Sequence, residues 1–370
     1  MINKYLVPPG FRDSLNFDTY IEHKYKNIIV DYFRNHGFSL IKPPLVEFTK
    51  NLNKNTLLIK TSRKKNELSL RNDITPQIIR IASSRLAYKK RPLKLCYYGE
   101  VVRNKGTILR PERQFQQVGA EIIGSDSYKG DVEIINLAYE TLKNIGVKNI
   151  VIDITAPFFI DSIVKKINNP DKKNQFKKLI NLKDFKNSIK LLSDKNQIES
   201  LKYLKACSGE IYNKSKKLKK LINTFGFEKE VNRLIKISQL IKIVKNDKLN
   251  IDFFETENEK YYDGIKFTFF AKDIRGEIAK GGRYILKYGN NRETAIGYTC
   301  FMDTILRASS YENKNKRIIV PFNTSKSKKN SLIKKGFSIF TSFENNSNLI
   351  HESKNFQCNY YLFKGQVKKI

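Results

Sequence analysis

Two polar side chains on one predicted strand are the first candidates for a binding site. Gln117 and Glu121 stand four residues apart in an apolar run at 115–123. Because side chains on a strand alternate between its two faces, Gln117, Gly119 and Glu121 share a face with Phe115. A buried carboxylate without a partner is costly, so packing alone does not explain Glu121. The pattern indicates a polar pocket, and a solvated outer face of the sheet is the alternative.

An acid and a hydroxyl group stand at a predicted junction between a strand and a helix. A short strand at 67–71 leads into Asp73 and Thr75, and a helix is expected to begin with Pro76. Either side chain can cap that helix by accepting a hydrogen bond from its backbone N–H groups. The same position suits a carboxylate that meets the ammonium group of a ligand, and both roles remain open.

Other residue types that could do chemistry give weaker signals. No G-x-x-x-x-G-K-[ST] or G-x-G-x-x-G pattern occurs, so the pair Gly281 and Gly282 is weak evidence for a phosphate site. The neighbouring Tyr261 and Tyr262 are typical of core aromatics. The histidines lie far from the cysteines and from clustered carboxylates. We therefore expect no metal, no cofactor and no Ser/His/Asp triad.

A long hairpin is expected to position the first group of residues. Apolar segments at 93–102 and 115–123 flank a charged loop at 103–113, and Arg103 ends the first strand. Two such runs around a polar connection are typical of antiparallel strands.

The segments before the hairpin also have clear patterns. An apolar stripe over residues 18–36 predicts an amphipathic helix, and Gly37 follows as its stop signal. Residues 38–48 read as an extended segment that Pro43 and Pro44 interrupt. Since proline cannot donate to a strand ladder, this segment is expected at a sheet edge or across a subunit interface.

Strands around a helical block predict an α+β domain with an antiparallel sheet. Lys- and Leu-rich stretches without strand alternation indicate a helical insertion at 168–247. Further elements are expected as a helix at 131–144, strands at 149–154 and 267–270, a helix at 301–308 and a strand at 317–321. The predicted organisation is a core of residues 1–167 and 248–310, the insertion at 168–247, and a short C-terminal α/β segment at 311–370 that opens with a linker.

Composition narrows the class of protein. The 370 residues are 40% hydrophobic and 12% aromatic, which excludes a wholly disordered chain. The net charge of +34 is compatible with nucleic-acid binding. It is also compatible with a coding bias toward lysine, because the lysines are spread over the whole chain. The four cysteines form no C-x-x-C pair and no run approaches about 20 apolar residues, so we expect a soluble cytoplasmic protein.

Taken together, these segments resemble the catalytic core of histidyl-tRNA synthetase, a class II aminoacyl-tRNA synthetase fold. The resemblance covers about residues 5–310 in the family's order and spacing. Residues 103–121 are similar to motif 2, since they keep its opening Arg, its F-x-Q and its Q-x-G-x-E. The other similar segments are motif 1 at 38–48 with Pro44, the ammonium-binding segment at 70–75, and the histidine-pocket signatures at Tyr261 and Tyr262 and at 281–284.

The departures from this family concern catalysis. Glu257 stands where the family has its histidine-specific catalytic Arg, and Thr304 stands where motif 3 has an ATP-binding Arg. Lys105 replaces an acid of motif 2. Removing one such preorganised group typically costs about 10²- to 10³-fold in rate, so adenylation should be abolished. The tail after residue 310 is also too short for an ordinary anticodon-binding domain.

A synthetase-like core that departs from the family at these catalytic positions resembles the regulatory subunit of ATP phosphoribosyltransferase. The segments LRNDITPQIIRIA, LCYYGEVVR, QQVGAEIIG, RGEIAKGGRY and TAIGYTCFMDTILRA are similar to that family. The resemblance implies a noncatalytic partner of the short-form catalytic subunit, dimeric within a hetero-octamer. That complex catalyses the first step of histidine biosynthesis and is under histidine feedback control.

The resemblance also implies roles for residues. Asp73 and Glu121 would face the ammonium or imidazole group of histidine, Thr75 and Gln117 would hydrogen-bond nearby, Arg103 would lie near the carboxylate, and Tyr261 and Tyr262 would line the ring pocket, with Gly281 and Gly282 beside them. Glu257 replaces an Arg common in this family too. A carboxylate there would repel the ligand's carboxylate, so we expect weak histidine affinity and relaxed feedback.

Two other functions remain open at this point. A histidine-tRNA ligase, active or degenerate, would exchange pyrophosphate with ATP in the presence of histidine. An RNA-binding protein derived from a synthetase core would bind RNA with a steep salt dependence.

Overall fold

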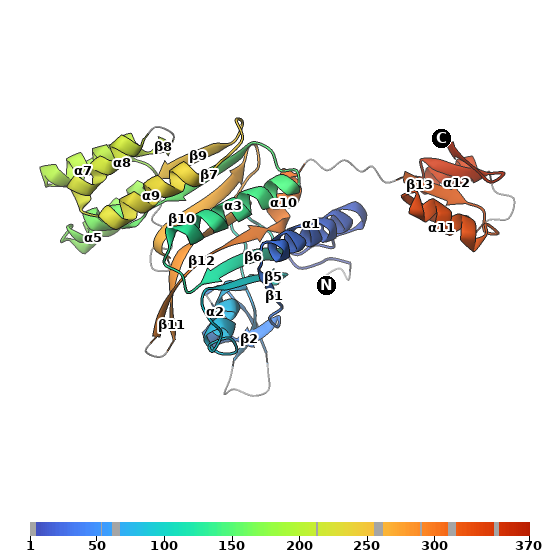
Figure 1. The fold of residues 1–370 in the computed structure, drawn as a ribbon, viewed down its shortest axis with the longest axis horizontal. Coiled ribbons are helices and arrows are strands. Elements are labelled where there is room, and N and C mark those ends of the chain that lie inside the picture. The colour runs from blue at the N-terminus through green and yellow to red at the C-terminus, as the bar shows by residue number, and fades with distance from the viewer. Residues whose placement is uncertain are drawn as a thin grey trace. The chain divides into compact units, whose positions relative to one another are not determined.

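The computed structural model describes residues 5–52, 54–60, 67–211, 214–254, 262–288, 291–309, 316–343 and 348–370. The chain divides into two compact units, Met1–Ser310 and Tyr311–Ile370 (Figure 1). The predicted linker at the start of the second unit lies outside the described residues.

A nine-stranded, mostly antiparallel sheet forms the centre of the first unit. Only the β1–β5 and β7–β9 pairs in it are parallel. In spatial order its strands are β1 (Ser39–Ile41), β5 (Leu93–Val102), β6 (Gln114–Ile123), β12 (Asn291–Phe301), β11 (Ala279–Tyr288), β10 (Tyr262–Ala271), β7 (Ile150–Thr155), β9 (Lys248–Asp252) and β8 (Gly209–Glu210). The predicted hairpin is confirmed as β5 and β6, with Leu93 opposite Ile123 and Val102 opposite Gln114.

Three helices pack on one face of this sheet: α1 (Asn16–Asn35), α3 (Tyr128–Asn144) and α10 (Met302–Ala308). Figure 1 shows α1 and α3 lying across the strands. The apolar stripe of α1 buries Ile29 and Phe33 completely, and Gly37 follows the helix with φ +82°. The helices predicted at 18–36 and 131–144 are therefore confirmed, and each begins two or three residues earlier than expected.

The opposite face of the sheet carries a small subassembly. It consists of β2 (Val46–Phe48), a 3₁₀ turn η1 (Thr49–Asn51), β3 (Leu57–Ile59), β4 (Leu68–Leu70) and α2 (Thr75–Ser83). Ile74 and Ile78 pack there with Tyr97 and Phe301 of the large sheet in one buried cluster.

The segment at 38–48 differs from the expectation of one extended strand. It forms two strands in two different sheets, β1 at the edge of the large sheet and β2 in the small one. Pro43 and Pro44 lie between them and cannot donate to a ladder. The predicted edge position of β1 is confirmed.

Helices dominate the chain between β7 and β9, as the composition predicts. They are α4 (Phe158–Lys165), α5 (Pro170–Asn181), α6 (Phe185–Lys190), α7 (Lys195–Cys207), α8 (Ser215–Phe225) and α9 (Glu228–Leu240). The rings of Phe225, Phe227 and Phe253 all contact Phe159, with centroids 5.1–5.5 Å away. These helices belong to the same compact unit as the sheet, and their status as an evolutionary insertion stays a prediction.

The second unit alternates strands and helices. Its elements are β13 (Lys316–Val320), α11 (Lys326–Lys334), β14 (Phe337–Thr341), α12 (Leu349–Asn355), β15 (Tyr360–Phe363) and β16 (Gln366–Lys369). The strand order is β14-β13-β15-β16, and β13 is parallel to both of its neighbours. Ile318, Val320, Leu332 and Leu362 form its core.

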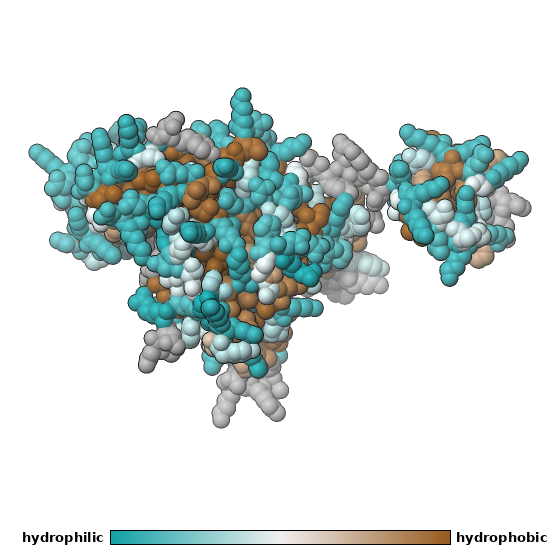
Figure 2. All heavy atoms as spheres, in the orientation of Figure 1, coloured by the Kyte–Doolittle hydropathy of each residue, from teal (hydrophilic) through white to brown (hydrophobic). Residues whose placement is uncertain are grey.

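Hydrophilic side chains cover much of the surface in Figure 2, and hydrophobic residues show between them in short stretches. Among the residues that the structure describes, each helix is too short or too polar to span a bilayer.

Candidate functional site

A cavity of about 110 Å³ lies on the sheet face opposite α3. It brings together seven of the residues predicted from the sequence: Asp73, Thr75, Arg103, Gln117, Glu121, Gly281 and Gly282. The rest of its lining is Lys280, Tyr284, Gly297, Tyr298, Thr299 and Phe301.

Strand alternation places the two polar residues of β6 in this cavity. Val118 and Ala120 point toward the helices and are fully buried there, whereas Gln117 and Glu121 point the other way. Both are only 2% exposed. The alternative of a solvated outer face is therefore wrong, because neighbouring strands and α2 cover this face.

Glu121 accepts two hydrogen bonds inside the cavity. Tyr284 Oη donates to one carboxylate oxygen at 2.9 Å, and Thr75 Oγ1 donates to the other at 3.4 Å. Burial raises the pKa of Glu121 to about 8, and these hydrogen bonds oppose the shift only in part. Glu121 is therefore mostly protonated at neutral pH, and a cationic group beside it would favour its ionised form.

At the strand-to-helix junction before α2 the structure shows the first of the two roles that the sequence left open, and the contact with a ligand's ammonium group stays a prediction. Asp73 Oδ1 accepts the N–H of Thr75 at 3.3 Å, which satisfies a donor at the start of the helix. The hydroxyl of Thr75 makes no such cap and lies within hydrogen-bonding distance of Tyr97 Oη, 3.2 Å away. Gln117 Oε1 accepts the N–H of Ile74 at 3.1 Å, so β6 also holds this turn in place.

Two cations contribute to the cavity, and the sequence reasoning found one of them. Arg103 stacks over the ring of Phe115 at 4.8 Å, and Lys280 lies 5.7 Å from the ring centre of Phe301. Burial raises the pKa of Asp73, while the charges of Arg103 and Lys280 lower it. The sequence reasoning missed Lys280, because a single lysine does not stand out in a chain so rich in lysine. Its position two residues before Gly282 on one strand could have identified it, since side chains two residues apart share a face.

The glycines of β11 and β12 make room for the carboxylate. A Cβ atom at Gly297 would overlap the carboxylate of Glu121, and one at Gly281 would overlap the backbone oxygen of Gly297. Gly281 and Gly282 thus form part of the cavity wall by close backbone approach. The sequence reasoning missed Gly297.

Three predicted residues are not tested by the geometry. Glu257 and Tyr261 lie outside the described residues, and of Tyr262 only the backbone is described, opposite Tyr284 in the β10–β11 pair. Within the described ranges, no group of three or more His, Cys, Asp or Glu side chains is placed to bind a metal ion.

Arg110 of the loop between β5 and β6 is folded into the protein near the cavity. Its side chain is 3% exposed and donates to Thr304 Oγ1 at 3.1 Å and to the backbone oxygen of Glu277 at 2.9 Å. Its Nε lies 3.1 Å from Asp303 Oδ2, and its guanidinium covers the ring of Phe301 at 3.8 Å. Lys105 in the same loop is exposed.

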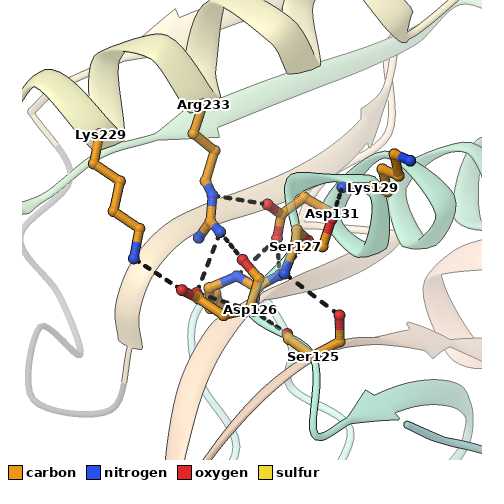
Figure 3. Close-up of polar contacts among 8 residues, drawn as sticks. Ser125, Asp126, Ser127, Lys129, Asp131, Lys229 and Arg233 are labelled. Atoms are coloured by element: carbon orange, nitrogen blue, oxygen red, sulfur yellow. Dashed lines mark hydrogen bonds and ion pairs between the residues drawn. The ribbon is translucent and has the colours of Figure 1, made fainter.

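Arg283 of the GGRY segment points away from the cavity, toward α3. It donates to Asp131 Oδ1 from Nε at 2.9 Å and from Nη2 at 2.6 Å. Arg233 of α9 reaches the second oxygen of Asp131 at 3.3 Å and also pairs with Asp126, to which Lys229 adds a contact at 2.8 Å (Figure 3). Asp131 thus joins a cavity strand to a helix of the helical block.

The relatives that comparison with known proteins identifies agree on one family. A family model described as histidyl-tRNA synthetase matches residues 10–305. An ATP phosphoribosyltransferase regulatory subunit from Paramagnetospirillum magneticum is 32% identical over 87% of this chain and 86% of its own length. A protein of the same name from Rhodospirillum centenum is 29% identical over 99% of this chain and 96% of its own.

Solved structures agree on the fold. A protein from Bacillus halodurans described as an ATP phosphoribosyltransferase regulatory subunit/histidyl-tRNA synthetase superposes with a TM-score of 0.80, at 18% identity over 98% of this chain and 97% of its own. Histidyl-tRNA synthetase from Nostoc superposes with a TM-score of 0.78, at 16% identity over 100% of this chain and 97% of its own.

Proposed function

This chain belongs to the histidyl-tRNA synthetase family and, within it, to the ATP phosphoribosyltransferase regulatory subunits, and from that premise we propose how it acts in histidine biosynthesis. It is a noncatalytic subunit that the short-form catalytic subunit needs for activity. Histidine binds in the cavity on the sheet face and lowers that activity. The observation that carries this proposal is a cavity with both carboxylates and cations, next to an arginine that is already paired within the chain.

The lining of the cavity matches a zwitterionic amino acid. Asp73 and Glu121 can receive an ammonium or imidazole group, and Arg103 can pair with a carboxylate. The hydroxyl of Thr75 and the amide of Gln117 lie beside them as hydrogen-bonding groups. In this proposal Tyr261 and Tyr262 complete the pocket around the ring, next to Gly281 and Gly282.

Feedback is proposed to be weak. Glu257 stands where relatives commonly carry an arginine, and its negative charge would oppose the carboxylate of histidine. We therefore expect half-maximal inhibition above micromolar histidine. A calorimetric titration that gives micromolar affinity would contradict this part of the proposal.

The contacts of Arg110 support a noncatalytic role. Thr304, which stands at the motif 3 position of the ATP-binding arginine, instead accepts a hydrogen bond from Arg110. The guanidinium of Arg110 is also held by Asp303 and by the ring of Phe301. A guanidinium paired in this way would have to leave its partners to meet a nucleotide phosphate, and leaving one buried partner unpaired is costly.

Self-association is proposed to use the small sheet. Val46 and Phe48 lie on the same face of β2, two residues apart, and both side chains are exposed. Exposed apolar groups that lie close together are typical of protein interfaces. We expect a dimer that assembles with the catalytic subunit into a hetero-octamer. Phe48→Asp should yield a monomer in analytical ultracentrifugation, and an unchanged dimer would contradict this interface.

An activity assay with the short-form catalytic subunit tests the proposal. Phosphoribosyl transfer to ATP should rise when the full-length chain is added, and histidine should lower it. Thr75→Ala removes a hydroxyl from the cavity and should weaken inhibition, whereas Thr224→Ala, an exposed position on α8, is the matched control. Exchange of pyrophosphate with ATP by the chain alone, or failure to bind the catalytic subunit, would overturn the noncatalytic assignment.

A further inference from the structure

Lys280 is a cation of the cavity lining to which the proposed function assigns no role. It lies on β11 between Thr268 of β10 and Thr299 of β12. Its side chain is 36% exposed and lines both the cavity and a second one of about 530 Å³. The strand fixes the backbone position of Lys280, and a small molecule can reach its ammonium group.

The partners of Lys280 in the chain are weak. Its Nζ lies 3.9 Å from Glu277 Oε1, which is longer than a hydrogen bond. The same oxygen lies 3.8 Å from Arg110, so two cations share it. Burial lowers the pKa of Lys280, and Glu277 opposes that effect. Among the residues described, Lys280 Nζ makes no hydrogen bond, so an anionic group in the cavity would improve its environment.

The charges of the lining residues indicate which charge a ligand group in this cavity would carry. Arg103 and Lys280 contribute two positive charges, and Asp73 contributes at most one negative charge. Glu121, with a pKa of about 8, is mostly uncharged at neutral pH. Among the described lining residues, positive charge therefore exceeds negative charge at neutral pH, which favours a ligand with a carboxylate.

The positions of the side chains place that carboxylate near Lys280. The rings of Phe115 and Phe301 are neighbours, with centroids 6.1 Å apart. Arg103 lies over the first ring and Lys280 lies near the second, and the charge of Arg103 contributes to lowering the pKa of Lys280, so both cations belong to this end of the cavity. Glu121 lies at the other end, opposite Gly297 and four residues along β12 from Phe301.

We propose that Lys280 is a specificity-determining residue whose ammonium group pairs with the carboxylate of the amino-acid ligand. This role rests on the proposed function, because it assigns a contact within the same cavity. With it, the cavity selects an amino acid over the amine of the same side chain. A hydrogen bond between charged groups at this position should contribute about 10- to 100-fold to affinity.

Two ligands that differ in the carboxylate test the assignment. L-histidine and histamine share the imidazole and the ammonium group, and only histidine carries the carboxylate. Titration calorimetry at neutral pH with the full-length chain should show tighter binding of histidine. Lys280→Met should reduce histidine affinity about 10- to 100-fold and leave histamine affinity unchanged, and Lys280→Arg should restore part of the preference.

Lys287→Met is the matched control, since Lys287 lies on the same strand, is exposed and does not line the cavity. It should retain the wild-type preference. If wild-type binds histidine and Lys280→Met keeps the full preference over histamine, the role of Lys280 is overturned while the histidine site stands. If wild-type binds neither ligand, the proposed histidine site fails and the role of Lys280 fails with it.

Discussion

Replacing Glu121 by Gln should change how stability depends on pH. Glutamine keeps the size of the side chain, and its oxygen can accept the hydrogen bond from Tyr284 while its NH₂ group can donate to the hydroxyl of Thr75. The substitution removes the ionisable carboxyl group. In the folded chain the pKa of Glu121 is raised to about 8 by burial, whereas its ordinary value is 4.5. Between those two pH values the folded state keeps a proton that the unfolded chain has lost.

The sign of the effect follows from this difference in bound protons. Because the unfolded state binds fewer protons in this window, the free energy of unfolding falls as the pH rises from 4.5 toward 8. Each pH unit corresponds to about 1.4 kcal/mol, so the full window is worth about 4–5 kcal/mol. In Glu121→Gln the free energy of unfolding does not fall for this reason, because glutamine does not titrate. The difference in unfolding free energy, wild-type minus variant, should therefore decline across the window.

Urea denaturation at about pH 5, 6.5 and 8 measures this difference. Glu199→Gln serves as the control, since the Glu199 side chain on α7 is 70% exposed and, within the described part of the chain, pairs only with Lys202 three residues away. It should show the same pH dependence as wild-type. A difference between wild-type and Glu121→Gln that stays constant over the three pH values would refute the assignment of a raised pKa to Glu121.

Three further predictions concern packing and burial. Gly297→Ala should place a methyl group against the Glu121 carboxylate, lower stability by about 1–3 kcal/mol and reduce histidine affinity, as thermal unfolding and calorimetry would show. Asp131→Asn should destabilise the chain by about 3–5 kcal/mol in urea denaturation, because Arg283 and Arg233 both lose their charged partner. All four cysteines are buried, so a thiol reagent at about pH 8 should modify none in the native chain and four in urea.

Much of the fold could be predicted because the relevant patterns are local. The apolar stripe of α1 and the paired apolar runs of β5 and β6 each lie within a short stretch of sequence. Strand β12 was missed although it lies at the centre of the sheet. It begins with the polar residues NRET and contains Gly297, so it shows neither alternation nor a continuous apolar run.

The site was predictable in part, through the resemblance of its motifs. Glu121 was found because an acid on an apolar strand is unusual, and Asp73 was found because an acid at a helix start can cap the helix or meet an ammonium group. Lys280 was missed because a lysine is not unusual in this chain. Tyr284 was predicted only as part of the GGRY segment, and its hydrogen bond to Glu121 joins residues 163 positions apart.

By itself the sequence determined part of the local structure, such as α1, α3 and the β5–β6 hairpin. It also determined that polar groups stand on apolar strands and which family the motifs resemble. The tertiary structure decided which of those groups meet. Thr75 reaches Glu121 across 46 positions, and Arg283 reaches Asp131 across 152. Gly282 and Arg283 are neighbours on β11, yet Gly282 lines the cavity and Arg283 points to the other face of the sheet, toward α3. Such pairings depend on strand order and register, which arise from packing of the whole sheet and are not encoded in any single local pattern.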